Sequence, residues 1–410
     1  MKIVSVEELA TVLGGIAVDE PRVVISGNLA TPASLLSLLD ANVESYRLFC
    51  LNAHLSLPLR RGVTHETPFV GPALRGRADF EYLPARLSMV PSLFATSHQP
   101  DVVLVNTSTP RDGKVTLGIE VNILPAAIEQ VRARGGLVIA QLNPLMPCIP
   151  GDGEISIDQI DVAIECEEEL GTLSARPATP LVETIGAHVA SQVPDGATLQ
   201  IGIGAVPDAV LTLLVERSGL KIWTETVSDG ILALERAGAL DSQAVITAGF
   251  LLGTLELYEW AARSGRVRLR RTEITNDPSE IARHDAMTSI NTALQIDLYA
   301  QSIASYCRGA IYSGFGGQSD FTVGAMHAPR GQAIIALPSW HEKSDRSTII
   351  DVATSPITSF QHSSVITEHG IAPVFGRSQR AQARSLISQA ADPRARQELW
   401  DAARRLGLAG

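Results

Sequence analysis

The sequence predicts an α/β protein with two domains whose sheets are mostly parallel. The chain has 410 residues, more than one core of ordinary size requires, so two domains of about 200 residues each are expected. Apolar residues make up 45% of the chain and charged residues 19%, so each half can bury a core. Apolar runs of strand length alternate with helical segments, and such alternation is typical of parallel βαβ units.

The N-terminal half contains this alternation in its simplest form. Residues 101–108 (DVVLVNTS) carry an unbroken apolar run, as a strand buried on both faces of a sheet does. A helical segment, 126–136, then ends on two glycines, and residues 137–143 (LVIAQLN) form the next expected strand. Thr31 and Pro32 are expected to open an earlier helix, with Thr31 as N-cap and Pro32 as the first residue.

An acidic segment followed by small residues and prolines, 166–180 (CEEELGTLSARPATP), separates the two halves. This composition is typical of a linker. We therefore predict one domain over residues 1–175 and another over residues 176–410. The expected elements at the start of the second domain are a helix opened by Thr179 and Pro180, a strand over 197–204, a helix from Pro207 and a strand over 221–227.

The charge balance and the cysteine and histidine patterns exclude several classes of protein. A formal net charge of −11 argues against a nucleic-acid partner, because phosphate binding needs a basic surface. The four cysteines include no CxxC pair and the nine histidines form no HxxxH or HxE pair, so no metal site is expected. Dispersed cysteines also fit a reducing compartment.

No segment is expected to direct the chain to a membrane or out of the cell. Glu7 and Glu8 stand where a signal peptide has basic residues, and Ser5 with Glu8 is expected to cap a helix. No apolar run reaches the roughly 18 residues that span a bilayer. We therefore expect a cytoplasmic protein with no membrane partner.

A glycine-rich turn, GIGAVPD (202–208), follows the first strand of the second domain. Gly202 and Gly204 lie between a strand and a helix, where backbone N–H groups at the positive end of the helix dipole can bind an anion. Two other interpretations stay open. One is a turn without a ligand, and the other is a dinucleotide site, although Pro207 stands where that pattern has its third glycine.

Two glutamates are expected at the carboxyl ends of buried strands, where parallel sheets bind their ligands. Glu225 lies in WTETVSDG (223–230) and Glu368 in VITEHGIA (365–372), so one crevice would suit both. A carboxylate held there in apolar surroundings can act as a nucleophile. Glu225 could also cap the next turn or pair with an arginine, and the residues alone favour that structural role.

A loop with three glycines in four positions lies at SGFGGQSDF (313–321). Bare backbone of this kind can approach a ligand closely and direct N–H donors at a developing oxyanion. The alternative is a flexible surface turn. Phe315 and Phe321 favour a packed loop over that alternative.

Together these segments resemble the acetyl-CoA hydrolase/transferase family, and within it the class I 4-hydroxybutyrate and butyrate:acetate CoA-transferases. The similarity runs in order through most of the chain. The matching stretches are YLPARLSMVPSLF (82–94), DVVLVNTSTPRDGKVTLG (101–118), VIAQLNPLMP (138–147), LQIGIGAVPDAVL (199–211), TETVSDG (224–230), TNDPSEIARHDAMTSINTALQIDL (275–298), SGFGGQSDF (313–321), IIALPS (334–339) and VITEHGIA (365–372).

The resemblance implies two related CoA-transferase-like domains of the NagB/RpiA type, with the active site in the cleft between them. By their positions in the family's motifs, Glu225 would be the nucleophile and Glu368 a second active-site glutamate. The backbones of Gly316 and Gly317 would stabilise the oxyanion. The residues expected to contact coenzyme A are Gln200, Ile201, Gly202, Ile203, Gly204, Gly314, Gln318 and Lys343.

The resemblance also implies a ping-pong transfer of coenzyme A between an acyl-CoA and a small carboxylic acid, through a glutamyl-CoA thioester on Glu225. Coenzyme A would serve as substrate and product, without a metal, and the protein would be a homodimer or a higher homo-oligomer. An acyl-CoA hydrolase of the same fold and a divergent, non-catalytic CoA-binding member remain alternatives. A nicotinamide dehydrogenase is disfavoured by Pro207.

Two departures from the family's pattern bear on the substrate pocket. Trp223 stands where the 4-hydroxybutyrate branch usually has histidine, and Ile303 stands where the family has asparagine. Trp223 is expected to reshape the acyl pocket, and Ile303 removes a hydrogen-bond donor from the reaction centre. We therefore expect the same fold with an altered rate or substrate.

Overall fold

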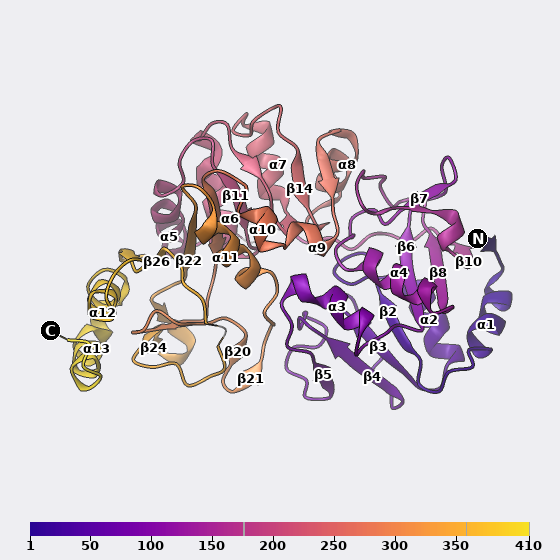
Figure 1. Ribbon diagram of the computed structural model, residues 1–410, viewed down its shortest axis with the longest axis horizontal. Helices are drawn as coiled ribbons and strands as arrows, with labels where there is room; N and C mark the ends of the chain where they lie inside the picture. Colours follow the sequence, from indigo (N-terminus) through magenta and orange to yellow (C-terminus); the bar gives the residue numbers. More distant parts are fainter. Residues whose placement is uncertain (175–176, 358, 410) are drawn as a thin grey trace. The chain divides into compact units, whose positions relative to one another are not determined.

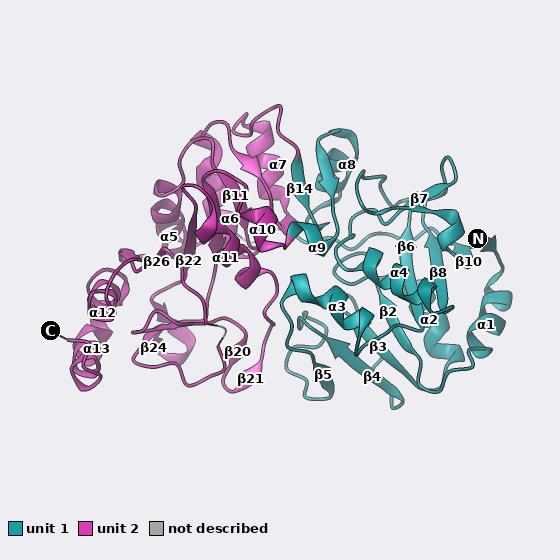
Figure 2. Cartoon of the chain, viewed as in Figure 1, with its two compact units in different colours: residues 1–173, 246–275 teal, residues 174–245, 276–410 magenta. Residues whose placement is uncertain are grey.

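The computed structural model describes residues 1–174, 177–357 and 359–409. The chain forms two compact units, which Figure 2 colours separately. Unit 1 contains Met1–Leu173 and Ile246–Thr275, and unit 2 contains Ser174–Val245 and Asn276–Gly410. Each unit has helices and a mostly parallel sheet, so the predicted α/β class is confirmed.

The predicted domain boundary, between residues 175 and 176, lies outside the described residues. The two compact units are not simply the parts of the chain before and after that boundary, because residues 246–275 pack with the N-terminal half. Backbone hydrogen bonds explain this placement. The N–H groups of Val121 and Asn122 both donate to the carbonyl oxygen of Gly249, at 3.1 Å. The chain therefore returns to unit 1 after it has entered unit 2.

Unit 1 is built on a sheet whose neighbouring strands run parallel. Its strands β6 (Val102–Thr107) and β8 (Leu137–Leu142) confirm the two that the apolar runs predict. β6 is buried at every position, which explains its unbroken apolar pattern. The strand order is β1 (Lys2–Ile3), β10 (Val162–Glu165), β8, β6, β2 (Arg22–Ile25), β3 (Tyr46–Cys50), β4 (Val63–Thr67) and β5 (Phe80–Tyr82) (Figure 1).

The first two helices of unit 1 show how local sequence sets a helix start. The hydroxyl of Ser5 accepts from the N–H of Glu8 at 3.2 Å and the Glu8 carboxylate accepts from the N–H of Ser5 at 2.9 Å, which confirms the predicted cap. The prediction that Thr31 is an N-cap is wrong, because its hydroxyl donates to the Gly27 carbonyl and Pro32 takes the cap position. The helices are α1 (Val6–Gly14), α2 (Ala33–Asn42), η1 (Leu87–Met89), α3 (Val90–Ala95), α4 (Leu124–Ala133) and η2 (Ile157–Gln159).

The segment that returns to unit 1 adds a small parallel pair of strands, β14 and β16. A separate antiparallel pair, β7 and β9, lies outside the main sheet. The bounds of these remaining elements of unit 1 are β7 (Lys114–Thr116), β9 (Glu154–Ser156), β14 (Ile246–Ala248), β15 (Phe250–Leu251), α8 (Leu255–Arg263), β16 (Val267–Leu269) and α9 (Thr272–Thr275).

A carboxyl group is buried in unit 1 at Glu120, whose residue surface is 1% exposed. Its Oε1 accepts from the Gly27 N–H at 3.1 Å and from the side-chain amides of Asn28 and Asn122 at 3.0 and 3.2 Å. Its Oε2 is buried and has no partner among the described residues. Burial raises the pKa of Glu120 to about 7, although these three hydrogen bonds oppose the increase.

Glu120→Gln is expected to stabilise the protein at alkaline pH. Between the ordinary pKa near 4.5 and the folded pKa near 7, only the folded state holds the proton. The free energy of unfolding therefore falls by about 1.4 kcal/mol per pH unit in that interval. Urea unfolding should find the variant close to wild type at pH 5 and about 3 kcal/mol more stable than wild type at pH 8, because about two pH units separate pH 5 from the folded pKa. Equal stability of the two proteins at pH 8 would contradict this account.

Unit 2 is built on a second sheet, in which one pair of neighbours, β26 and β27, is antiparallel and the others are parallel. The predicted strand over 221–227 is wrong in its extent, because β12 ends at Ile222 and β13 (Thr226–Val227) is separate. Glu225 lies between them and bonds to Asn276 instead of to a neighbouring strand. The strand order is β12 (Lys221–Ile222), β11 (Thr198–Ile201), β17 (Met287–Asn291), β22 (Gln332–Ala336), β26 (Ser364–Thr367) and β27 (Gly370–Pro373).

The first helix of unit 2 begins at Pro180, as predicted, and the hydroxyl of Thr179 accepts from the Val182 N–H at 3.4 Å. No helix in the described parts of the chain is both long and apolar enough to cross a membrane. The helices of unit 2 are α5 (Pro180–Ser191), α6 (Ala205–Leu213), η3 (Leu214–Glu216), α7 (Asp229–Arg236), α10 (Pro278–Ile281), α11 (Gln318–His327), η4 (Glu342–Ser344), α12 (Gln379–Ser385), η5 (Leu386–Ala390) and α13 (Pro393–Arg405).

Short strands outside the second sheet carry part of the chain that follows β17. β18 pairs with β19 in antiparallel and with β25 in parallel orientation, while β20 with β21 and β23 with β24 form hairpins. Their bounds are β18 (Gln295–Asp297), β19 (Ser302–Ile303), β20 (Tyr306–Cys307), β21 (Ala310–Ile311), β23 (Trp340–His341), β24 (Arg346–Ser347) and β25 (Ile349–Ile350).

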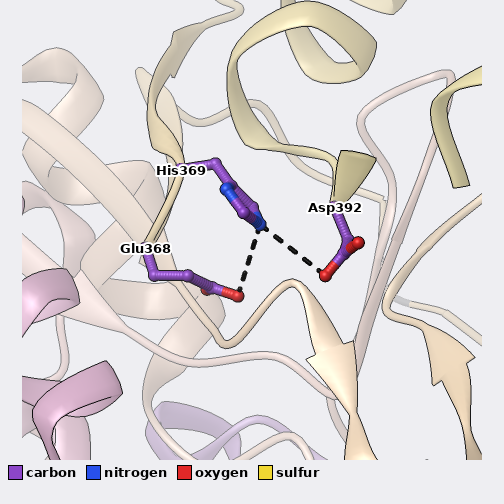
Figure 3. Close-up of side chains that lie close together, drawn as sticks. All are labelled: Glu368, His369 and Asp392. Carbon is purple, nitrogen blue, oxygen red and sulfur yellow. Dashed lines mark ion pairs between the residues drawn. The ribbon is translucent and has the colours of Figure 1, made fainter. Parts of the chain in front are cut away.

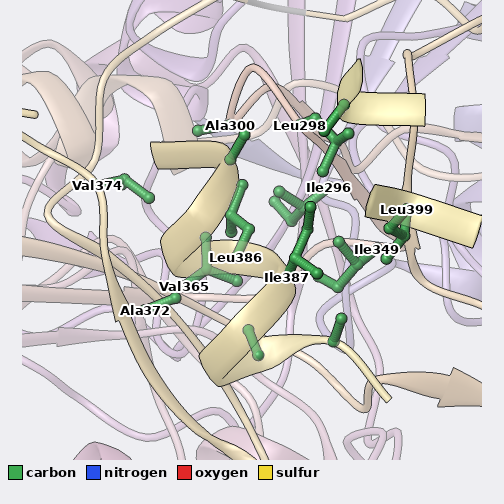
Figure 4. Close-up of a cluster of buried hydrophobic side chains, with 14 of the residues drawn as sticks. Ile296, Leu298, Ala300, Ile349, Val365, Ala372, Val374, Leu386, Ile387 and Leu399 are labelled. Carbon is green, nitrogen blue, oxygen red and sulfur yellow. The ribbon is translucent and has the colours of Figure 1, made fainter. Parts of the chain in front are cut away.

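The C-terminal helices of unit 2 pack on these strands through a continuous apolar cluster (Figure 4). Leu386 and Ile387 of the π-helical turn η5 lie in the same cluster as Ile296 and Ile349 from the paired strands β18 and β25. All four side chains have no exposed surface. Burial of this kind stabilises each side chain by roughly 1.5–3 kcal/mol. The cluster thus anchors the chain segment that carries β19 and its neighbours.

Candidate active site

Glu225 lies in an irregular stretch between β12 and β13, at the carboxyl end of β12. The side-chain amide of Asn276 donates to its Oε2 at 3.3 Å, and the backbone N–H of Gly317 is a second donor. A Cβ atom built on Gly317 would lie 2.0 Å from the same oxygen. The carboxylate therefore occupies the space that any other residue at position 317 would fill.

Protein groups around this carboxylate change its acidity. The residue keeps part of its surface exposed, but burial of the carboxyl group raises the pKa of Glu225 to about 7. The negative charge of Asp320, a fully buried residue of α11, adds to this increase, while the hydrogen bonds from Asn276 and Gly317 oppose it. At neutral pH the group is divided between acid and carboxylate. A carboxylate with a raised pKa is a better nucleophile than one in water.

The glycine-rich loop runs directly into α11 and brings Gly317 to the N-cap position of that helix. Gly316 has a φ of +53°, a left-handed conformation that favours glycine. The carbonyl oxygen of Gly314 accepts from the hydroxyl of Ser305 at 2.8 Å, and the Gln318 amide donates to the Thr292 carbonyl at 3.2 Å. The loop is therefore held in place by side-chain hydrogen bonds.

The predicted coenzyme A segment, 200–204, divides into a buried part and an exposed part. Gln200 is buried and forms hydrogen bonds with Ser289 and Asn291 on β17, and Ile201 is buried in the sheet. Gly202, Ile203 and Gly204 lie beyond the strand, with Ile203 43% exposed and Gly204 at a φ of +123° before α6. The exposed part is the one that a ligand can reach.

Glu368 lies in the hairpin turn between β26 and β27, with partners different from those of Glu225. Its Oε2 accepts from the Ser339 N–H at 2.9 Å and its Oε1 accepts from the Ser339 hydroxyl. His369 Nε2 lies 3.8 Å from Glu368 Oε1 and 3.7 Å from Asp392 Oδ2 (Figure 3). Whether Glu225 and Glu368 act together stays a prediction.

The Glu368, His369 and Asp392 side chains are close enough to hold a cation. Asp392, however, already accepts hydrogen bonds from the backbone and guanidinium of Arg394, and this guanidinium lowers the pKa of Asp392 to about 2. Asp392 is also the N-cap of α13. These contacts explain the cluster without a cation: it holds the β26–β27 hairpin against the start of α13.

Lys343 lies exposed in the short helix η4, within the hairpin formed by β23 and β24. The Arg394 guanidinium stacks over the Trp340 ring, with its Cζ atom 3.9 Å from the ring centroid. The Trp340 indole N–H donates to Asp345 Oδ1 at 3.2 Å. This cation–π contact ties the hairpin to the start of α13. The role of Lys343 in binding coenzyme A stays a prediction.

The two residues that depart from the family's pattern lie in packed surroundings. The centroids of the Trp223 and His284 rings lie 4.4 Å apart, and Trp223 also packs against the apolar cluster that includes Phe321. Ile303 is 1% exposed and lies on β19, which pairs with β18. Trp223 thus packs against a core cluster of unit 2, and Ile303 is itself buried in that unit. Their assignment to the substrate pocket stays a prediction.

A small pocket of unit 2 adjoins the glycine-rich loop. Its lining includes Phe315 and Gln318 of the loop region, together with Ser302 and Ala304, which flank Ile303 in sequence. Successive side chains in an extended segment point to opposite sides, so the flanking residues line the pocket and Ile303 packs behind it. The lining residues are Ser302, Ala304, Ser305, Phe315, Gln318, Ser319, Pro356, Ile357 and Phe360.

Sequence reasoning missed Asn276 and Asp320, two neighbours of the Glu225 carboxylate. Asn276 directly precedes Asp277, the N-cap of α10. The sequence pattern there indicates a helix start at Asp277 and gives no role to Asn276. Asp320 lies inside the glycine-loop motif, where a charged residue directly before the apolar Phe321 was the available signal.

Comparison with known proteins agrees with this fold and with the motifs around the site. Residues 64–173 match the model of the acetyl-CoA hydrolase/transferase N-terminal domain, and residues 253–403 match that of the C-terminal domain. The chain is 33% identical over 408 residues to the 4-hydroxybutyrate coenzyme A transferase of Clostridium kluyveri, covering 93% of this chain and 94% of that one. The chain belongs to the acetyl-CoA hydrolase/transferase family.

Two further proteins support this membership over nearly the full chain. The succinyl-CoA:acetate/propanoyl-CoA:succinate CoA transferase of Fasciola hepatica is 32% identical over 416 residues, covering 95% of this chain and 86% of that protein. The crystal structure of RipA from Yersinia pestis is 28% identical and superimposes with a TM-score of 0.91, covering 99% of this chain and 98% of RipA. The fold and the family resemblance are thus confirmed.

Proposed function

We propose that this protein is a class I acyl-CoA:carboxylate CoA-transferase that uses Glu225 as its nucleophile. One observation supports this most directly: a carboxyl group with a pKa of about 7 contacts the Gly317 backbone and the Asn276 amide. These two donors can also serve an oxyanion on a substrate that approaches the carboxylate. The substrates are an acyl-CoA and a small carboxylic acid, by analogy with the named activities of the relatives.

The reaction transfers coenzyme A from one acid to another through two covalent intermediates, both formed on the Glu225 carboxylate. The Glu225 oxygen attacks the thioester carbonyl, the carbon–sulfur bond breaks, and an acyl-glutamyl anhydride and the CoA thiolate form. The thiolate then attacks the glutamyl carbonyl, which releases the first acid and leaves a glutamyl-CoA thioester. A second acid reverses both steps. Over the complete cycle one thioester and one carboxylate are converted into another thioester and another carboxylate, so the overall free-energy change is small and no redox step occurs.

The other predicted site residues have roles that follow from their positions. The Gly316–Gly317 backbone stabilises the oxyanion in each tetrahedral intermediate. The exposed turn at Gly202–Gly204 and Lys343 bind coenzyme A, with Gln200 and Ile201 supporting that turn from the sheet. Glu368 orders the segment that contains Ser339 near the bound substrate. We further propose a cytoplasmic homodimer or higher homo-oligomer that needs no metal.

Hydrolysis of acyl-CoA is the second candidate function, because the family includes hydrolases as well as transferases. In that reaction, water attacks the glutamyl-CoA thioester in place of a second acid. The two functions are separated by measuring the release of coenzyme A with and without an acceptor acid. Release that requires the acid supports the transferase, and equal release without it supports the hydrolase.

The covalent intermediate is the decisive test of the proposal. The protein is incubated with acetyl-CoA, butyryl-CoA or 4-hydroxybutyryl-CoA, treated with borohydride, and analysed by intact-protein and peptide mass spectrometry. Borohydride reduces a glutamyl thioester to the corresponding alcohol, so the peptide that contains Glu225 should lose the mass of one oxygen and gain that of two hydrogens. Binding of acyl-CoA without this change would favour a non-catalytic CoA-binding protein.

A further inference from the structure

Trp223 stands two residues before the candidate nucleophile, and its backbone is fixed to the neighbouring strand. Its N–H donates to the Leu199 carbonyl at 3.1 Å, and the Thr224 hydroxyl donates to the Ile201 carbonyl at 3.4 Å. Leu199 and Ile201 both belong to β11. The sheet therefore fixes the chain up to the residue before Glu225.

The Trp223 side chain is half-buried and packs against an apolar cluster of unit 2. Its ring also stacks on the His284 ring at a tilt of 40°, with the two centroids 4.4 Å apart. An aromatic side chain buries roughly 150–250 Å² in contacts of this kind, so its size strongly affects how its neighbours pack. The buried members of the cluster are Ile281, Met287, Phe321, Ala325, Ala328 and Ala333.

One member of this cluster lies one helical turn from the first donor to Glu225. The Phe321 N–H donates to the Gly317 carbonyl at 3.0 Å, in the first turn of α11, and Phe321 is fully buried. The Gly317 N–H in turn donates to the Glu225 carboxyl group. Packing that fixes Phe321 therefore fixes the end of α11 that presents this donor.

A second member of the cluster, Ile281, has the same relation to the other donor. The Ile281 N–H donates to the Asp277 carbonyl at 3.0 Å, in the single turn of α10. Asn276 directly precedes Asp277 and donates its side-chain amide to Glu225 at 3.3 Å. The His284 N–H donates to the Ile281 carbonyl at 3.2 Å, so the imidazole that stacks on the indole continues the same segment.

The two helices also pack closely against each other. A Cβ atom built on Gly324 of α11 would lie 2.5 Å from the Cβ atom of Ile281 on α10. Contact this close leaves little room for either helix to shift alone. Because Trp223 packs against the cluster that both helices share, its size bears on the position of both donors at once.

We propose that Trp223 is a positioning residue for CoA transfer, which fills the cluster shared by α10 and α11 and so holds both donors on the Glu225 carboxylate. In this role it does not touch the substrate, and it changes only how well the carboxylate is aligned for attack. An alignment error of about 1 Å is costly when atoms react. This inference rests on the proposed transferase function and adds to it a residue that acts through the nucleophile.

A residue that lines the acyl pocket would act differently. An indole in contact with the acyl chain discriminates between chains of different length, since one methylene group in an apolar pocket changes kcat/KM by about tenfold or more. A positioning residue acts on the carboxylate, so its loss costs the same factor for every acyl group. The dependence on chain length therefore separates the two roles of Trp223.

The test measures formation of the glutamyl-CoA thioester by rapid quench with acetyl-CoA, butyryl-CoA and hexanoyl-CoA over a range of concentrations. Trp223→Ala should lower the maximal rate by about 100-fold with all three, while the half-saturating concentration changes by less than about threefold. Trp223→Phe keeps an aromatic ring against the cluster and should retain the wild-type rate within about threefold. Trp223→Leu leaves a smaller cavity than alanine and should show the same selective loss at about tenfold, which keeps the test valid if Trp223→Ala unfolds.

Trp260→Ala is the matched control, because Trp260 is also a half-buried tryptophan but lies on α8 in unit 1. It should leave the maximal rate unchanged, and melting temperatures identify any variant that has unfolded. A loss that differs among the three acyl groups, or a wild-type rate in folded Trp223→Leu, overturns this inference alone. Absence of the thioester from the wild-type protein overturns the proposed function as well.

Discussion

Glu225→Gln is expected to reduce CoA transfer by about 10⁴-fold or more, the scale on which removal of an enzyme's nucleophile acts. The amide has nearly the same shape as the carboxyl group, so it can still accept from Asn276 and from the Gly317 N–H. Binding of acyl-CoA should therefore persist, while the reduced alcohol at position 225 should be absent from mass spectra. The loss concerns the chemical step and not the fold.

The pH profile of the wild-type protein provides a second test of Glu225. Its pKa is about 7 and the carboxylate is the reacting form, so kcat/KM should rise about tenfold per pH unit below 7 and level off above it. Asn276→Ala removes a hydrogen bond that lowers this pKa, so the inflection should move to higher pH. Initial rates with saturating acceptor acid between pH 5 and pH 9 measure both profiles.

Glu368→Gln is the matched comparison, since Glu368 is the other glutamate assigned to the site. Its oxygens already accept from the Ser339 N–H and hydroxyl, so its replacement should weaken local order and reduce activity less than Glu225→Gln does. If Glu225→Gln retained substantial transfer and Glu368→Gln abolished it, the nucleophile would be Glu368. Melting temperatures of both variants separate these effects from unfolding.

The local sequence pattern correctly predicted elements that depend only on neighbouring residues, such as a strand buried along its whole length or a helix cap. β6 is buried at all its positions, and the cap formed by Ser5 and Glu8 needs only four consecutive residues. Local pattern failed where distant segments compete for the same groups. The Thr31 hydroxyl bonds to Gly27 instead of capping α2, and residues 246–275 join unit 1 through backbone bonds to Val121 and Asn122.

The same distinction applies to the candidate site. Glu225 and Gly317 lie in motifs whose glycines and strand-end carboxylate carry a signal in sequence. Asn276 lies 51 residues from Glu225, and only the folded chain brings its amide to 3.3 Å from the carboxylate. The raised pKa depends on that arrangement and on the buried Asp320, so sequence could predict a nucleophile but not its acidity.

Gly317→Ala is expected to reduce kcat by about 100-fold while the protein stays folded. The added Cβ atom would lie 2.0 Å from Glu225 Oε2 and 2.4 Å from the Asn276 amide nitrogen, far inside van der Waals contact. The carboxylate must therefore move by an ångström or more, and a displacement of that size costs about 100-fold when it misaligns reacting atoms. The φ of Gly317 is −91°, which alanine adopts readily, so the backbone itself is not strained.

The effect should appear in the first half-reaction, before any acceptor acid binds. Rapid-quench measurement of the glutamyl-CoA thioester from acetyl-CoA would find slow formation in Gly317→Ala, with a melting temperature near that of wild type. Gly14→Ala serves as the control, because a Cβ at Gly14 in α1 meets no atom within 4 Å. That variant should form the thioester at the wild-type rate. Rapid formation in Gly317→Ala would mean that the carboxylate reacts from a position other than its contact with Gly317, and the proposed geometry of attack would then be wrong.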